Sequence, residues 1–331
     1  MPRLAESATF SIGVDLGGTN LRAAAMTPTG ETLEEFSIPT KVGAGPERIV
    51  ERIVEGVEEG REGHSGSKLI GVGVGAPALI RLETGVIAKA PNLPGWEEFP
   101  LQRELETRLG LPVILENDAN AAALGEVWLG TGHDVNDMIL LTLGTGIGGG
   151  IISEGKILHG YLGLAGELGH ITVDANSSHV CACGNRGCIE AHGSGTAIRR
   201  VATAAAKAGQ VPVLSELLGS HGELTPALVA QAAQQGCAEA LRIYDDVGRA
   251  LGWGLAGLVN VFNFPLYLLA GGILASWALF APAMFEEVEA RSLVYRSSDT
   301  RIEKATLGAK AGIYGAAYLP IQKYGSIVAQ V

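Results

Sequence analysis

Two stretches of the chain share one pattern, and this repetition constrains the fold more than any other feature. "FSIGVDLGGTNLRAAAM" begins at residue 10, and "MILLTLGTGIGGGIIS" covers residues 138–153. Each contains an apolar strand, a tip of glycine and threonine, and a second apolar strand, which predicts a β-hairpin. Two such hairpins, each at the start of an α/β unit, predict a duplicated α/β fold of two domains with an interdomain cleft.

The segments after each hairpin complete the two units. The first hairpin is followed by a helical pattern at 45–60, the strand "KLIGVGVGAP", the helical "EEFPLQRELETRL" and the strand "LPVILEN". After the second come a cysteine-rich segment, an alanine-rich helical stretch and the strand "LYLLAGG". We expect the C-terminal "LGAKAGIYGAAYLP" to form a helix that packs back on the first half.

Composition limits the partners. The net charge of −11 over 331 residues argues against a nucleic-acid partner. Residues 250–285 contain no charged residue and no histidine, but their Asn, Pro and Gly breaks predict helix, buried strand and helix rather than a membrane span. The start "MPRLAESATFSIG" has no secretory pattern, and four cysteines make a poor disulfide framework. We therefore expect a cytoplasmic protein.

The glycine tips are candidate phosphate sites. "GTGIGG" at 144–149 matches the dinucleotide motif G-x-G-x-x-G, but a strand pattern follows it where that motif requires a helix. A Rossmann site is therefore rejected. A bare glycine tip still lets a phosphate reach main-chain N–H groups, although a tight hairpin alone would also explain it. In the first tip the predicted residues are Gly17, Gly18 and Thr19.

Polar residues stand at two strand ends. Asp15 ends the first strand. There it either stabilises the turn, as aspartate before glycine often does, or it is an anion that orders hydrated Mg²⁺ beside the phosphates. Asp118, in "ENDANAAALGE", is either a helix cap or a carboxylate that the helix N-terminus keeps ionised, ready to accept a proton from an alcohol. Asn92, in the turn "PNLPGW", can bond a polyol or its own backbone.

The segment "CACGNRGCIE" at 181–190 holds three of the four cysteines. Tetrahedral zinc requires a fourth ligand, and His170 in "GELGH" ranks first on spacing, ahead of His179 and His192. Three cysteines and a histidine would leave no open position, which predicts structural Zn²⁺. Such an ion would fasten Glu190 to the turn that carries Glu167 and His170.

The motifs together resemble the ROK family of sugar kinases and repressors. They are "VDLGGTNLR", "PNLPGW", "ENDANAAALGE", "LTLGTGIGGGI", "GELGHI", "CACGNRGCIEAHGSGTAI" and "LAGGI". The resemblance implies an actin-like, hexokinase-type (ribonuclease H-like) fold, and ATP-dependent phosphorylation of glucose to glucose 6-phosphate with Mg²⁺. We assign residues 1–117 and the C-terminal helix 310–331 to a small domain, and residues 118–309, with a zinc-binding segment at 170–190, to a large one.

The resemblance also implies roles for individual residues, with Asp118 as the general base. The implied sugar contacts are Asn92, Asn117, Asp118, Glu167, His170 and Glu190. The implied nucleotide contacts are Gly144, Thr145 and Gly146 at the phosphates and Gly271 and Gly272 near the adenosine. The implied zinc ligands are His170, Cys181, Cys183 and Cys188. One departure is Ala78 in "GAPALI", where the family commonly has glycine and where a methyl group would crowd a sugar.

Other activities stay open at this point. The substrate is glucose, or else another hexose or an N-acetylated aminosugar such as fructose, mannose, N-acetylglucosamine or N-acetylmannosamine. A phosphoryl donor other than ATP is a further alternative. A sugar-responsive regulator would need an N-terminal DNA-binding segment, for which the first strand, beginning by Thr9, leaves no room. The family implies a homodimer or homotetramer, with no membrane and no nucleic-acid partner.

Overall fold

A computed structural model describes residues 8–90 and 93–328 of the chain. The chain forms two compact units. The first consists of residues 1–136, 150–166 and 305–331, and the second of residues 137–149 and 167–304. The domain boundaries expected from the sequence, after residues 117 and 309, stay a prediction. The structure adds that residues 118–129 pack with the first unit's C-terminal helix.

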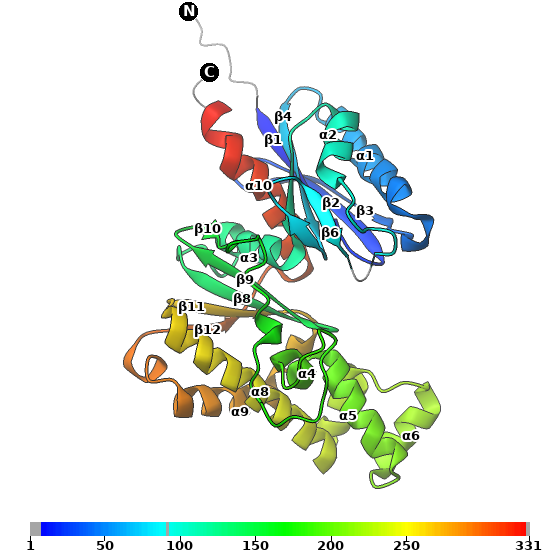
Figure 1. Cartoon of the computed structure of the whole chain (residues 1–331), viewed down its shortest axis with the longest axis vertical. Coiled ribbons are helices and arrows are strands. Elements are labelled where there is room, and N and C mark those ends of the chain that lie inside the picture. Colours follow the sequence, from blue (N-terminus) through cyan, green and yellow to red (C-terminus); the bar gives the residue numbers. More distant parts are fainter. Residues whose placement is uncertain (1–7, 91–92, 329–331) are drawn as a thin grey trace, which may run out of the picture. The chain divides into compact units, whose positions relative to one another are not determined.

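The first unit is built on a five-stranded sheet of order β3-β2-β1-β4-β7 (Figure 1). Its strands are β1 (Thr9–Leu16), β2 (Asn20–Met26), β3 (Thr32–Pro39), β4 (Lys68–Ala76) and β7 (Val113–Asn117). The predicted hairpin is present as the antiparallel pair β1–β2, while β4 runs parallel to both β1 and β7. The carboxyl ends of β1, β4 and β7 therefore meet at one edge of the sheet, which is where parallel sheets place ligands.

Helices cover both faces of this sheet. They are α1 (Pro46–Gly63), α2 (Leu101–Leu109), α3 (Asp118–Leu129) and α10 (Ala311–Val328), and β5 (Leu79–Arg81) pairs with β6 (Val86–Lys89) beside the sheet. Alternate residues of β1 divide between the faces. Phe10 and Ile12 enter the core with α1, whereas the Ser11 hydroxyl donates to a carbonyl of α10. Gly13 lies on the α10 face, where a Cβ would collide with the helix backbone. The predicted packing of the C-terminal helix on the first half is confirmed.

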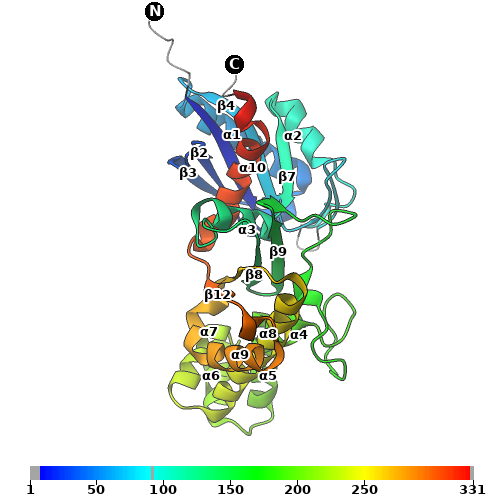
Figure 2. The ribbon, with the colours of Figure 1, turned by 90° about the vertical axis from the view of Figure 1, so that its left-hand side faces the viewer.

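The other predicted hairpin begins in the second unit with β8 and ends in the first, which also includes β10. Its sheet has the order β10-β9-β8-β11-β12, in which β9 crosses from the second unit into the first. The strands are β8 (Met138–Leu143), β9 (Ile147–Ser153), β10 (Lys156–Ile157), β11 (Leu266–Ala270) and β12 (Arg301–Lys304). The helices are α4 (Ile189–Gly193), α5 (Gly195–Lys207), α6 (Pro212–His221), α7 (Pro226–Gln234), α8 (Ala238–Phe262) and α9 (Trp277–Arg291). The last two pack along each other (Figure 2).

The long apolar stretch at 250–285 forms the end of α8, the buried strand β11 and the start of α9, as the sequence predicts. Asn263 ends α8 in a left-handed conformation (φ 50°), and Gly271 ends β11 at φ 99°. Pro282 lies inside α9 and not in a turn. In the part of the chain that the structure describes, no helix is long and apolar enough to cross a membrane.

Candidate functional site

The junction of β7 and α3 places Asp118 on the first turn of a helix. The cap of this helix is Asn117, whose Oδ1 accepts from the backbone N–H of Ala119 at 2.9 Å and of Asn120 at 3.3 Å. Asp118 follows the cap, and its Oδ1 accepts from Ala119 at 2.9 Å. Since Asn117 supplies the cap, capping does not explain the carboxylate at 118. The Asn117 Oδ1 is engaged by the helix, so its amide NH₂ is the group that can reach a sugar hydroxyl.

Asp15 lies at the same edge of the sheet. The strand register puts it level with Gly75 of β4, and Gly75 level with Glu116 of β7. A Cβ on Gly75 would lie 3.8 Å from the Cα of Asp118, so the sheet brings the two aspartates onto one face. Burial, reinforced by the Asp118 charge and opposed by Arg22, raises the pKa of Asp15 to about 6. Two close carboxylates of this kind suit a hydrated divalent cation.

We predict that Asp15→Asn stabilises the protein above pH 6. Between pH 4 and 6 the folded chain keeps a proton that the unfolded chain has released, so stability falls as pH rises through this window. Asparagine has no such proton to lose, and the gain at pH 8 should reach up to about 3 kcal/mol. Thermal unfolding of both proteins from pH 4 to 8 measures it. An equal gain at pH 4 and pH 8 would contradict the raised pKa.

Glu116 and His159 form an ion pair that sequence reasoning missed. Glu116 is only 3% exposed, and its Oε2 lies 2.7 Å from the Nε2 of His159. The one sequence signal was an acidic residue inside an apolar strand, "VILEN", because a buried acid needs a partner. Nothing in the spacing pointed to His159, which is 43 residues away. The pairing comes from tertiary structure.

The first glycine tip turns main-chain N–H groups outward. Thr40, which follows β3, donates hydrogen bonds to two carbonyl groups of the tip. The Thr40 hydroxyl donates to Gly17 O at 2.6 Å, and the Thr40 N–H donates to Thr19 O at 2.8 Å. Within residues 8–90 and 93–328, the N–H groups of Gly18 and Thr19 have no protein acceptor. A tip that presents N–H groups and hides carbonyls can bind an anion.

The second tip repeats this construction. The start of α5 donates hydrogen bonds to two carbonyl groups of this tip. The Gly195 N–H donates to Gly144 O at 2.8 Å, and the Thr196 hydroxyl donates to Thr145 O at 2.8 Å. In the described part of the chain, no protein atom accepts from the N–H groups of Thr145 and Gly146. In the described residues, each tip therefore has two N–H groups without a protein acceptor, whereas the Gly17 N–H donates to Asn20 O at 3.1 Å and the Gly144 N–H donates to Gly146 O at 2.9 Å.

The turn at Gly271 and Gly272 follows β11. Gly271 has φ 99° and packs so closely on β8 that a Cβ would collide with the backbone of Leu143. Gly272 is exposed, and a Cβ there would meet no atom within 4 Å. The turn is therefore packed tightly against β8 at Gly271 and open at Gly272, where a flat ligand would have room to make contact.

Four predicted metal ligands come together in the second unit. One ligand atom from each of His170, Cys181, Cys183 and Cys188 lies within 4.8 Å of all the others. His170 ends the short 3₁₀ helix η2 (Leu168–His170), and Cys188 precedes α4. The alternatives His179 and His192 lie outside this group, with ring centroids 5.9 Å from each other.

The spacing of these atoms fits zinc. A tetrahedral ion with Zn–S of about 2.3 Å and Zn–N of about 2.0 Å requires S···S near about 3.8 Å and S···N near about 3.5 Å. The Sγ atoms of Cys183 and Cys188 are 3.7 Å apart, and the Cys181 Sγ is 3.5 Å from the His170 Nδ1. Burial raises the pKa of Cys181 to about 12, and coordination to a cation would stabilise its thiolate. The Nε2 of His170 lies 3.8 Å from the Glu167 carboxylate, which suits an outer-shell partner of a ligating histidine.

Glu190 joins the cysteine cluster to the second glycine tip. Its Oε1 accepts from the Cys181 thiol at 3.4 Å, and its Oε2 accepts from the Ile147 N–H at 2.9 Å. A Cβ on Gly146 would collide with the same carboxylate. The structure thus links the predicted metal site, a predicted sugar contact and a predicted phosphate loop through one side chain.

The other predicted residues do not belong to the groups described above. Glu167 is exposed, immediately before η2. Asn92 lies outside the described residues. Ala78 is 6% exposed and belongs to the hydrophobic core of the first unit. Its methyl group therefore packs among core side chains, and its effect on a sugar stays a prediction.

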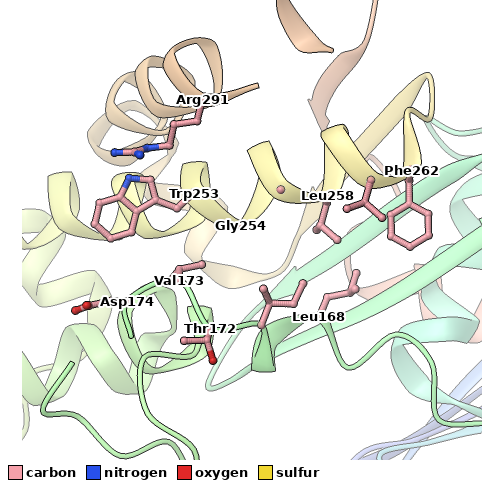
Figure 3. Close-up of a pocket in the computed structure, with 12 residues that line it drawn as sticks. Leu168, Thr172, Val173, Asp174, Trp253, Gly254, Leu258, Phe262 and Arg291 are labelled. Carbon is pink, nitrogen blue, oxygen red and sulfur yellow. The ribbon is translucent and has the colours of Figure 1, made fainter. Parts of the chain in front are cut away.

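A separate groove of about 800 Å³ lies in the second unit (Figure 3). Leu168 and the following residues, including Thr172 and Val173, form one wall, and α8 forms the other. Arg291 stands over the ring of Trp253, with 5.5 Å between the guanidinium carbon and the ring centroid. None of the predicted ligand or substrate residues lines this groove.

The chain is similar to known proteins over nearly its whole length. A model of the ROK family matches residues 11–323. The glucokinase of Halalkalibacterium halodurans is 40% identical over 318 residues, which are 96% of this chain and 96% of that protein. The glucokinase of Thermotoga maritima is 37% identical over 314 residues, or 95% of this chain and 98% of that one.

Solved structures give the same result. A ROK hexokinase from Thermus thermophilus has a TM-score of 0.81 at 33% identity, over 95% of this chain and 99% of that one. A ROK glucokinase from Streptomyces griseus, solved with glucose and AMPPNP, has a TM-score of 0.75 at 34% identity, over the same shares. The predicted actin-like, hexokinase-type fold is confirmed, and the chain belongs to the ROK family.

Proposed function

We propose that the chain is an ATP-dependent glucokinase. The observation that carries this proposal is the β7–α3 junction, where Asn117 caps the helix and Asp118 stands beside Asp15. A carboxylate there can take the proton of an attacking sugar hydroxyl. The similarity to glucokinases over 95–96% of the chain favours glucose as that sugar.

We assign the other roles by chemistry. Phosphoryl transfer depends on positioning and charge neutralisation more than on covalent help. The N–H groups of the two glycine tips would hold the phosphates of ATP, and Asp15 would hold a water shell of Mg²⁺. Gly271 and Gly272 would adjoin the adenosine. The proposed sugar contacts are Asn92, Asn117, Asp118, Glu167, His170 and Glu190.

Zinc is proposed as a structural ion. His170, Cys181, Cys183 and Cys188 would hold it in a closed shell, where it stabilises the turn before α4 and has no open position for a substrate. We also propose a cytoplasmic location, because the proposed phosphoryl donor is ATP. The expected homodimer or homotetramer stays a prediction, which light scattering on the purified protein would test.

The deciding experiment is a coupled assay with ATP across a panel of sugars. We expect kcat/KM for glucose to exceed that for fructose, mannose, N-acetylglucosamine and N-acetylmannosamine. The same panel with polyphosphate and with ADP in place of ATP tests the donor. Turnover of an aminosugar without turnover of glucose would refute the substrate assignment while leaving the kinase assignment intact.

A further inference from the structure

Glu116 is a buried carboxylate whose bonding depends on one histidine. A buried charge is costly unless it is paired and hydrogen-bonded. The Oε2 of Glu116 accepts from the His159 Nε2 at 2.7 Å. Its Oε1 accepts from the Asn117 N–H at 2.9 Å and from the Asn120 side-chain amide at 3.0 Å. The carboxylate is therefore satisfied on both oxygens while His159 donates to it, and this contact also raises the pKa of His159.

The bonds of Glu116 fix the turn that carries Asp118. Asn117, which precedes Asp118, caps α3, and Asn120, which follows in the first helical turn, is only 2% exposed. Both donate to the same oxygen of Glu116. Without the His159 bond, the other oxygen would lose its partner in the protein interior, and the carboxylate would have to turn toward another donor. That rotation would disturb the two bonds that hold the turn.

The main chain of His159 closes a loop that ends just before Glu167. The His159 carbonyl accepts from the Ala165 N–H at 3.0 Å. Within this loop Gly163 has φ 76°, and a Cβ there would lie 3.2 Å from the Leu82 side chain, so the loop rests on the segment after β5. The next residues along the chain are Gly166 and Glu167. One residue thus ties the start of this loop to β7.

We propose that His159 is a positioning residue of the kinase, an inference that rests on the proposed function. Through Glu116 it holds Asn117 and Asp118 in place, and its carbonyl closes the loop 159–165. It does not touch the reacting atoms. The role requires a hydrogen-bond donor at the position of Nε2, and it does not require the imidazole to exchange protons.

Two amide substitutions test this requirement. In His159→Gln the side-chain NH₂ reaches the position of Nε2, whereas in His159→Asn it reaches only that of Nδ1. We expect the asparagine variant to lose about 10- to 100-fold in kcat/KM for glucose, and the glutamine variant to recover most of that loss. His221→Gln is the matched control, because His221 is exposed on α6, and it should behave as the wild type.

Three results would overturn the inference. In the first, His159→Asn keeps the wild-type kcat/KM. In the second, it lowers only the melting temperature, which makes the ion pair structural and nothing more. In the third, His159→Gln melts like the wild type yet stays as inactive as His159→Asn, which means that the imidazole itself takes part in the reaction.

Failure of the glucokinase assignment can be distinguished from failure of the role proposed for His159. If the wild type phosphorylates no sugar of the panel, the glucokinase assignment fails, and hydrogen exchange still tests the geometry. We expect the amides of residues 119–121 to exchange faster in His159→Asn than in wild type, and at the wild-type rate in His159→Gln. Equal rates in all three proteins would refute the role of His159 in holding the junction.

Discussion

Replacing Asp118 with asparagine should lower kcat for glucose by about 10²- to 10⁴-fold while changing the sugar dissociation constant little. The substitution is nearly isosteric, and its Oδ1 can still accept from the Ala119 N–H as Asp118 does at 2.9 Å. The helix cap is unaffected because Asn117 supplies it. What disappears is the carboxylate oxygen that accepts the proton of the attacking hydroxyl.

Two measurements separate this loss from a structural defect. Binding of glucose by calorimetry should stay close to wild type, since an amide can bond a hydroxyl but cannot act as a base at neutral pH. The pKa of Asp15 should fall, because the Asp118 charge is one of the causes that raise it. Asp299→Asn, at an exposed position of the second unit, is the control. Near-normal kcat in Asp118→Asn would show that another group is the base.

The fold could be predicted because local patterns and topology agreed. Both hairpins, the buried strand at 266–270 and the packing of the C-terminal helix follow from strand alternation, glycine tips and helical periodicity. The start of α2 was less well placed, because "EEFPLQRELETRL" reads as one helix from residue 97 while the structure begins it at Leu101, after Pro100. Proline favours the first turn and breaks the pattern before it.

The metal cluster and the tips could be predicted in part. Close sequence spacing found the three cysteines, but the choice among three histidines needed the turn of η2, which brings the His170 Nδ1 to the Cys181 sulfur. Sequence showed which residues have no side chain at the tips. It could not show that Thr40 and Thr196 take up the tip carbonyls, because those contacts join segments 21 and 51 residues apart.

Buried electrostatics could not be predicted. The raised pKa of Asp15 depends on its burial and then on Asp118, about a hundred positions along the chain. The Glu116–His159 pair depends on how the loop after β10 returns to β7. The burial of Ala78 in the core was likewise not visible in its place beside a family motif. In each case the deciding quantity was which distant segments surround a side chain, and that is set by tertiary packing.

Cys183→Ser should cost the protein its zinc, its local order and its affinity for glucose together. A serine hydroxyl is a poor zinc ligand, and three remaining ligands do not close the shell. Cys188 immediately precedes α4, which carries Glu190, and the Glu190 Oε2 accepts from the Ile147 N–H at 2.9 Å, so disorder at the cluster would reach the second glycine tip. We expect KM for glucose to rise about tenfold or more, with KM for ATP rising as well.

Cys237→Ser provides the matched control, because Cys237 is the one cysteine of the chain that lies outside the cluster, just before α8. It should keep its zinc, measured by atomic emission, and both KM values. Removing the ion from wild type with a chelator should reproduce the Cys183→Ser kinetics, and adding zinc back should reverse them only in the wild type. If Cys183→Ser lost its zinc and kept a normal KM for glucose, the cluster would be stabilising α4 without fixing Glu190. The connection from Cys188 through Glu190 of α4 to Ile147 would then have no part in sugar binding.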